Sequence, residues 1–185
     1  MKLKKNEKKN LLKLSRVVLK KELGINNEEL PPKNEKFDEK RGVFVTINNK
    51  GSLRGCIGYI KAVDTIWESV KRMTKQAAFH DPRFSSIKKN EVDDLNIEIS
   101  VLSKLKEVKD KKEIKIGRDG LLIRKKFYSG VLLPQVATEY NWDRIEFLQN
   151  TCKKAGLQSD CFKDETVKVY RFSAEVFDER GLNVD

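Results

Sequence analysis

The chain has 185 residues, of which 38% are hydrophobic and 36% charged, a composition that excludes an intrinsically disordered protein. No apolar run approaches the roughly 20 residues of a membrane span, and the first residues lack the apolar region of a secretory signal, so we expect a cytoplasmic protein with no membrane segment. The net charge of +11 fits either an anionic partner such as RNA or a merely solvated basic surface.

The first third of the chain predicts a helix, a connector and a hairpin. Residues 7–23 carry an apolar stripe at helical spacing between lysines, and Gly24 suits the helix end. Residues 25–40 contain two prolines and read as a connector. Residues 42–47 alternate apolar and other side chains, a turn follows, and the strand 53–60 returns antiparallel.

A second helix and a third strand follow the hairpin. Thr65 and Glu68 have the spacing of a capping box, and apolar residues then recur at helical spacing until Pro82 ends the pattern. Residues 96–102 alternate as a strand with Ile97, Ile99 and Val101 toward the core. The opposite face carries three polar side chains and faces either solvent or a polar pocket, and composition favours solvent; the three are Asn96, Glu98 and Ser100.

The last third predicts another hairpin, two helices and a final strand. The hairpin strands are 121–127 and 129–133, a short helical segment opens at Pro134 and Gln135, and a strand covers 166–177. A longer helix over 143–155 is expected to turn four side chains inward, namely Ile145, Phe147, Leu148 and Cys152. The pattern indicates an α/β (α+β) chain with a mostly antiparallel sheet, and we see no boundary between independent domains.

The three cysteines give no metal-binding pattern. Cys56, Cys152 and Cys161 show no CxxC spacing and the chain has one histidine, so we predict no metal site and no cofactor. Cys152 and Cys161 are able to pair in principle, but in a cytoplasmic protein we expect buried, reduced thiols.

The stretch 53–58, Leu-Arg-Gly-Cys-Ile-Gly, is the leading candidate site. Alternation along a strand puts Arg54, Cys56 and Gly58 on one face, and a guanidinium beside a thiol favours the nucleophilic thiolate. Gly55 and Gly58 allow a ligand or another backbone to come close. The alternatives are that Cys56 is a small buried side chain and that Arg54 pairs with Asp81 or Glu98 to hold the structure together.

Other candidates follow the motif in the chain. Glu98 is a general-base candidate if it faces a pocket beside Cys56, and otherwise a solvated strand residue; Ser100 shares its face. Asp81 and Arg83 either contact a ligand or form a turn, and His80 either assists Cys56 or caps a helix.

Three residues near the second hairpin suit base recognition or stacking. They are Gln135, Trp142 and Asp143. Core packing and helix capping explain Trp142 and Asp143 equally well.

Taken together, these segments resemble the AMMECR domain family, in the family's order and over about residues 8–180. The segments that carry the resemblance are 53–58, 77–84, 97–102, 117–121, 132–136, 142–143, 147–152, 155–157 and 170–177. Where family members have prolines after the Asp-Pro-Arg-Phe run, this chain has Ser85 and Ser86, which affects the shape of that loop.

The resemblance implies a fold and a class of function. The expected fold is a two-lobed α/β fold with a mostly antiparallel sheet flanked by helices and the 53–58 motif near a cleft. We expect a single domain over residues 1–185, with two subdomains as an option. The family's molecular function is unestablished; a role in RNA or nucleobase modification has been proposed, and a Memo-type protein and a radical SAM protein often accompany its members.

The working hypothesis is an enzyme, or an enzyme subunit, that modifies RNA or a nucleobase. Cys56 would be the nucleophile with Glu98 as a second catalytic group, and a further set would bind the ligand: Arg54, Gly55, Gly58, Asp81, Arg83, Ser100 and Gln135. The rival hypotheses are a binding module that docks a Memo-type or radical SAM partner, and a protein that binds nucleic acid through its lysines.

Overall fold

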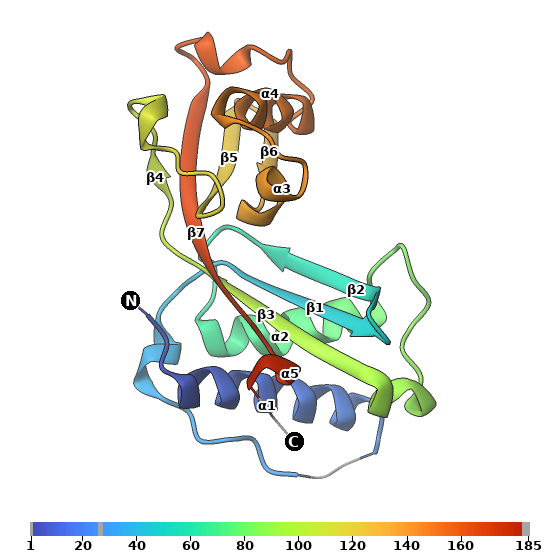
Figure 1. The fold of residues 1–185 in the computed structure, drawn as a ribbon. Coiled ribbons are helices and arrows are strands. Elements are labelled where there is room, and N and C mark those ends of the chain that lie inside the picture. The colour runs from blue at the N-terminus through green and yellow to red at the C-terminus, as the bar shows by residue number, and fades with distance from the viewer. Residues whose placement is uncertain (1, 26–27, 183–185) are drawn as a thin grey trace. The chain divides into compact units, whose positions relative to one another are not determined.

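The structure, a computed structural model, describes residues 2–25 and 28–182. The chain divides into two compact units: the first contains residues up to 102 and from 175 onward, and the second contains residues 103–174. Helices and strands mix in both units and the strand pairs are antiparallel, so the expected two-lobed α/β fold is confirmed (Figure 1). Within the described residues no helix is long and apolar enough to cross a membrane.

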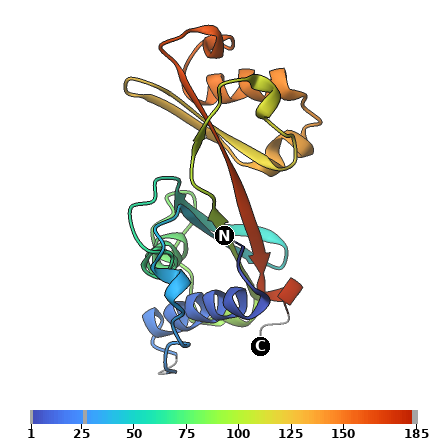
Figure 2. The same ribbon diagram turned by 90° about the vertical axis from the view of Figure 1, so that its left-hand side faces the viewer.

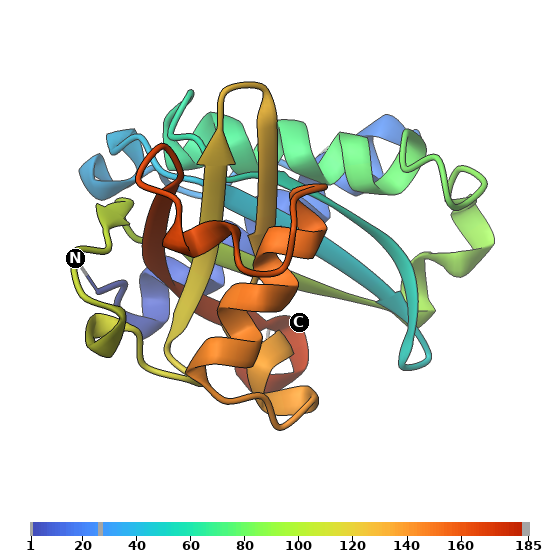
Figure 3. The same cartoon turned by 90° about the horizontal axis from the view of Figure 1, so that it is seen from above.

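The first unit contains a small antiparallel sheet. β1 (Val43–Asn49) lies between β2 (Ser52–Tyr59) and β3 (Leu95–Leu102). α1 (Lys5–Glu22) and α2 (Ile66–Phe79) pack on one face of these strands, and Figure 3 shows α2 running along β1 and β2. The core forms because Val43, Val45 and Ile47 alternate toward the helices and meet the leucine stripe of α1.

Local signals explain the ends of both helices. Gly24, after α1, has a φ of +62°, a left-handed conformation that glycine adopts without a steric cost. At the start of α2, the Thr65 hydroxyl accepts a hydrogen bond from the backbone N–H of Glu68 at 3.3 Å. The helices predicted over 7–23 and after Thr65 are therefore confirmed.

The second unit is built on β5 (Asp119–Lys125), which pairs with β6 (Tyr128–Leu132) in a hairpin and with β7 (Lys168–Asp178) on its other side. The short β4 (Lys106–Glu107) also pairs with β7. α4 (Arg144–Lys154) packs on the hairpin through Phe147 and Leu148, and α3 (Pro134–Glu139) precedes it. Figure 2 shows α4 beside the hairpin. Residues 175–178 of β7 belong to the first unit, where α5 (Glu179–Leu182) follows.

Two predictions in the second unit are wrong. Ile145 is 41% exposed because it lies in the first turn of α4 at the edge of the apolar stripe, roughly 160° around the helix from the buried Phe147. Cys152 and Cys161 form a disulfide and are not free thiols. The chain turns back after α4 into the short 3₁₀ helix Cys161–Lys163, and this return brings the two Cα atoms within 5.9 Å.

The polar face of β3 is also not open to solvent in the way its composition predicts. Asn96 and Ser100 are both buried. The Asn96 side chain donates a hydrogen bond to a carboxylate oxygen of Asp178 at 3.1 Å and accepts one from the backbone N–H of Arg180 at 3.2 Å. Asn96 is therefore buried because the C-terminal segment binds it.

Candidate functional site

Cys56 lies in the middle of β2 and is one of three polar side chains that form a row across the sheet. Thr46 of β1 is directly opposite Cys56, and Glu98 of β3 is directly opposite Thr46. Opposed residues of antiparallel strands project on the same face, so the row lies on the face away from α1 and α2. The Thr46 hydroxyl donates a hydrogen bond to the Cys56 sulfur at 3.2 Å. The thiol is half-buried and is the one free cysteine.

An ion pair from the segment after α2 holds the backbone of Cys56. β2 is an outermost strand, so alternate backbone groups on its outer edge lack a strand partner. The N–H of Cys56 donates to Asp81 Oδ2 at 2.9 Å, and Arg83 Nη2 donates to the carbonyl oxygen of Cys56 at 3.2 Å. Asp81 and Arg83 are joined by two hydrogen bonds, of 3.0 and 2.7 Å. Together they satisfy both backbone groups of Cys56.

The charges of this pair are fixed by their hydrogen bonds. The Asp81 side chain is 2% exposed, yet hydrogen bonds from the Arg83 side chain, with help from the Cys56 and Arg83 backbone N–H groups, hold its pKa far below the usual range. The pKa of Arg83 is raised, first by its hydrogen bond to Asp81 and, more weakly, by the charges of Asp81 and Cys56. Arg83 is thus a cation in the electrostatic environment of the thiol.

Arg54 is committed to a different contact. Its Nε and Nη2 donate to the Glu91 carboxylate at 2.8 and 3.2 Å. Nη1 donates to the carbonyl oxygen of Ser85 at 2.6 Å, and Nη2 also donates to that of Ser86 at 3.2 Å. The alternative in which Arg54 pairs with Asp81 or Glu98 therefore names the wrong partner, because the ion pair that Arg54 forms is with Glu91. The β1–β2 register shifts at this end of β2, where Arg54 is an extra residue. Glu91 has its pKa lowered, mainly by the hydrogen bond from Arg54.

Both glycines of the motif are needed for packing within the chain. A Cβ atom on Gly55 would lie 2.1 Å from the carbonyl oxygen of Ala77 in α2, and one on Gly58 would lie 2.3 Å from the ring of Phe44. The expected close approach of another backbone is thus made by α2. The space beside each glycine is filled by the protein itself.

Glu98 and Ser100 lie farther along the same face. Glu98 is half-buried, and burial, together with the nearby charge of Asp178, raises its pKa. Two strand spacings separate its Cα from that of Cys56, roughly 10 Å. Ser100 is opposite Phe44 in the next row, where Phe44 covers Gly58.

The predicted residues do not all converge on one cavity. A surface recess of about 520 Å³ lies beside the end of β2. Its lining includes Arg54 and Arg83 but not Cys56, Asp81 or Glu98; the remaining lining residues are Phe84, Ser85, Lys88, Asn90 and Glu91. Arg83 therefore connects two features, because it contacts Cys56 on one side and the recess on the other.

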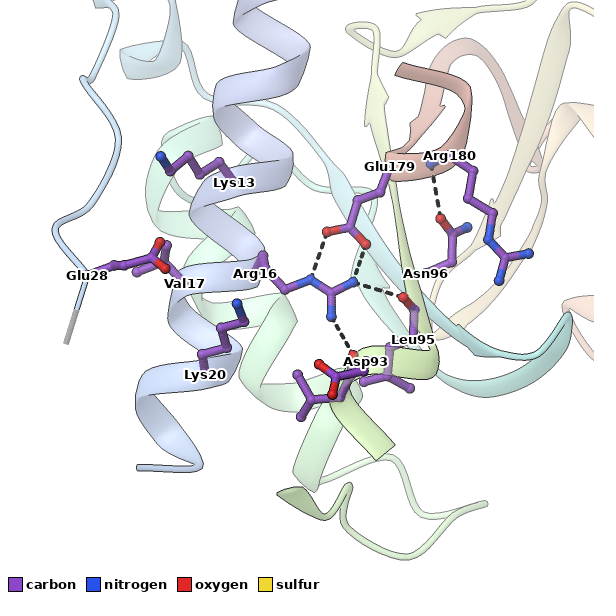
Figure 4. A pocket seen from close by; sticks show the side chains of 11 residues that line it. Lys13, Arg16, Val17, Lys20, Glu28, Asp93, Leu95, Asn96, Glu179 and Arg180 are labelled. Carbon is purple, nitrogen blue, oxygen red and sulfur yellow. Dashed lines mark hydrogen bonds and ion pairs between the residues drawn. The ribbon is translucent and has the colours of Figure 1, made fainter. Parts of the chain in front are cut away.

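A larger pocket of about 760 Å³ lies between α1, β3 and α5 and contains none of the predicted site residues (Figure 4). The guanidinium of Arg16 forms an ion pair with Glu179 and donates to the carbonyl oxygens of Val92 and Leu95, each at 2.9 Å. Glu179 also accepts from the backbone N–H of Ile97 at 2.7 Å. These contacts anchor α5 to α1 and β3, so the polar groups at this pocket are structural.

The other candidates have local contacts. The backbone N–H of His80 donates to Gln76 at the end of α2, so His80 caps that helix. In the second unit, Trp142 stacks on Tyr140 with ring centroids 4.9 Å apart, and the Asp143 side chain caps α4. Gln135 is exposed on α3. Among the described residues no cluster of three potential metal ligands exists.

Sequence reasoning missed Thr46, Glu91 and the role of Arg83. A signal existed for Thr46, because the hairpin register pairs it with Cys56. No signal in the sequence marks Glu91 as the partner of Arg54.

Comparisons with known proteins give a consistent family. The AMMECR1 family model matches residues 12–177. A protein of Methanothermobacter thermautotrophicus is 43% identical over 187 residues, which cover 97% of each chain. Protein PH0010 of Pyrococcus horikoshii is 42% identical, and its crystal structure, described as that of an uncharacterized protein, matches with a TM-score of 0.79 over 91% of this chain and 89% of that one.

Proposed function

Since the chain belongs to the AMMECR1 family, whose matched relatives have names that state no activity, we propose a function from its own site: an enzyme that acts through the Cys56 thiol on a nucleobase, free or in RNA. The observation that carries the proposal is the hydrogen bond from the Thr46 hydroxyl to the Cys56 sulfur on a half-buried thiol. A donor aimed at sulfur stabilises the anionic, nucleophilic form.

The surroundings of Cys56 supply the other groups that such chemistry needs. The Cys56 thiolate would add to an electrophilic ring carbon, forming a C–S bond while the electron pair of the ring double bond moves to a conjugated carbonyl oxygen. Glu98 has a raised pKa, so its carboxyl group keeps its proton to higher pH and serves as the donor to that oxygen. Cys56 and Glu98 stand on either side of Thr46 on one face of the sheet, so a planar ring lying over Thr46 would meet both groups.

The test is the alkylation rate of Cys56 with iodoacetamide at pH 7, followed by mass spectrometry. Labelling is unambiguous because the other two cysteines are in a disulfide. We expect Cys56 to react faster than an unperturbed thiol, and Thr46→Val to slow the reaction about fivefold, which corresponds to one hydrogen bond of about 1 kcal/mol. Cys56→Ser is the blank, and a Thr46→Ser variant, which keeps a hydroxyl, is the matched control. A wild-type rate equal to that of a free thiol would refute the proposal.

A second candidate function is a non-catalytic module that docks a partner, either a Memo-type or radical SAM protein. The observation that favours it is that Arg54, Gly55 and Gly58 are all engaged in contacts within the chain, so folding alone accounts for these three residues of the motif. On this view Arg54→Ala loosens the loop that Arg54 holds and weakens partner capture, while Cys56→Ser leaves capture intact.

A third candidate, supported by the net charge of +11, is direct RNA binding through the lysines. It predicts that the logarithm of affinity falls steeply with the logarithm of salt concentration. An affinity that does not change with salt excludes it.

A further inference from the structure

We infer that the recess beside Arg83 binds a phosphate group of the substrate on which Cys56 acts, and that Arg83 and Lys88 are its ligands. This inference rests on the proposed function and adds to it the part of the substrate that is recognised. The phosphate belongs either to a free nucleotide or to the backbone of RNA, which present the same chemistry to the recess.

The recess offers two cationic side chains that retain free donors. Arg83 uses Nε and Nη2 for Asp81 and for the carbonyl oxygen of Cys56. Its Nη1 has no partner among residues 2–25 and 28–182, and the side chain is 53% exposed. Lys88 is exposed, and within the same part of the chain its ammonium group has no partner. A guanidinium held in place by Asp81 is pre-organised to donate to a phosphate oxygen.

The other lining groups do not oppose an anion. The Glu91 carboxylate is neutralised by Arg54, which holds it with two hydrogen bonds. Asn90 is exposed and brings an amide donor. The guanidinium of Arg83 lies over the ring of Phe84 at 5.3 Å, which adds an aromatic surface of the kind on which bases stack.

The recess is coupled to the thiol through a single side chain. Arg83 donates from Nη2 to the carbonyl oxygen of Cys56, and its other terminal nitrogen, Nη1, has no partner in the described residues and can donate to a ligand. A phosphate at Nη1 would therefore bind the same side chain that holds the backbone of Cys56, although the thiol itself does not line the recess. The volume of about 520 Å³ is within the range of small-molecule sites.

The test compares two alkylating reagents that differ in charge, iodoacetate and iodoacetamide. Both reagents react with the thiolate. The ratio of the iodoacetate rate to the iodoacetamide rate is therefore independent of the thiolate fraction, and it reports the local preference for an anion. We expect this ratio at Cys56 to exceed that of N-acetylcysteine amide at 50 mM salt and to fall toward it at 1 M salt, where screening is strong. Lys88→Gln should lower the ratio about two- to fivefold, as removal of one nearby exposed cation does.

Lys61→Gln, which removes an exposed lysine that is not part of the recess, is the matched control and should leave the ratio unchanged. Arg83→Lys keeps a cation but removes the fork, and should lower the ratio less than Arg83→Gln. Protection of Cys56 by a nucleoside monophosphate but not by a short RNA identifies the nucleotide as the source of the phosphate, and the reverse identifies RNA. A ratio equal to that of the free thiol, or unchanged by Lys88→Gln, overturns the inference. A slow reaction with iodoacetamide alone overturns the proposed function instead.

Discussion

Gly55→Ala is predicted to destabilise the first unit strongly, because its new Cβ atom would overlap the backbone of α2. The atom would lie 2.1 Å from the carbonyl oxygen and 3.0 Å from the carbonyl carbon of Ala77. Relief requires a shift of about 1 Å of either β2 or the end of α2. Around Ala77 the helix buries Met73 and Ala78 against the core, so the shift also disturbs packing there. Overpacking against a backbone of this kind costs about 3 kcal/mol.

The assay is urea unfolding followed by circular dichroism, with the free energy of unfolding taken from the midpoint and slope. Cys56→Ala, at the next position of the same strand, is the matched control and should cost about 1 kcal/mol, since it removes the sulfur and the hydrogen bond from Thr46. A loss below about 1 kcal/mol for Gly55→Ala would show that the space beside Gly55 is open to a ligand, and the packing explanation would then be wrong.

Four further perturbations test the electrostatics and the cross-link. Arg16→Met leaves the buried Glu179 carboxylate without its cation and should lower the free energy of unfolding by about 3–5 kcal/mol. The double variant with Glu179→Leu should recover part of that loss, and a loss below about 1 kcal/mol in the single variant would contradict the argument. The pKa of Asp81 is lowered in the folded protein, so its contribution to stability is complete above about pH 4, the pKa of an aspartate in the unfolded chain, and is lost as the pH falls below that value. Asp81→Asn should therefore flatten the acid limb of a curve of stability against pH, and Asp93→Asn, at an exposed position, is the control. Glu98 has a raised pKa, so ionisation costs stability as the pH rises through its ordinary value, and Glu98→Gln should stabilise the protein at pH 7 relative to pH 4. Reduction of the disulfide, which spans a sequence separation of 9, should cost about 2–3 kcal/mol in the chain-entropy model; identical unfolding midpoints with and without dithiothreitol would refute this.

Periodicity predicted the secondary structure well because it reports the buried face of each element. The helix α1, the hairpin of β1 and β2, and β3 all follow from apolar spacing, and the Thr65 cap follows from one local side-chain contact. Ile145 was misplaced because two residues at the edge of an apolar stripe differ in burial only through what the helix meets. The disulfide depends on how the chain returns after α4, which spacing in sequence does not determine.

The candidate site was predicted only in part because its contacts join segments that are distant in sequence. Alternation correctly gives the face on which Cys56 lies. The charged residue nearest to Cys56 in sequence is Arg54, but its side chain binds Glu91 and the carbonyl groups of the loop. The cation that reaches the backbone of Cys56 is Arg83, 27 residues downstream. Pairwise proximity along a strand predicts a neighbour on the same face, but the direction of a long, flexible side chain depends on which acceptors the fold places around it.

This exchange of arginines changes what a mutational test of the motif means. Arg54 fastens the segment 85–91 to the end of β2, and that segment supplies Lys88 and Asn90 to the recess. Loss of activity in Arg54→Ala would therefore follow from displacement of the recess, because Arg54 uses most of its donors for Glu91 and the carbonyl groups of Ser85 and Ser86. Arg83→Lys, which keeps the charge but removes the fork, separates the two roles: it should preserve the contact between Arg54 and Glu91 while weakening anion recognition at Cys56. If both variants instead leave the alkylation ratio unchanged, the thiol and the recess are not coupled.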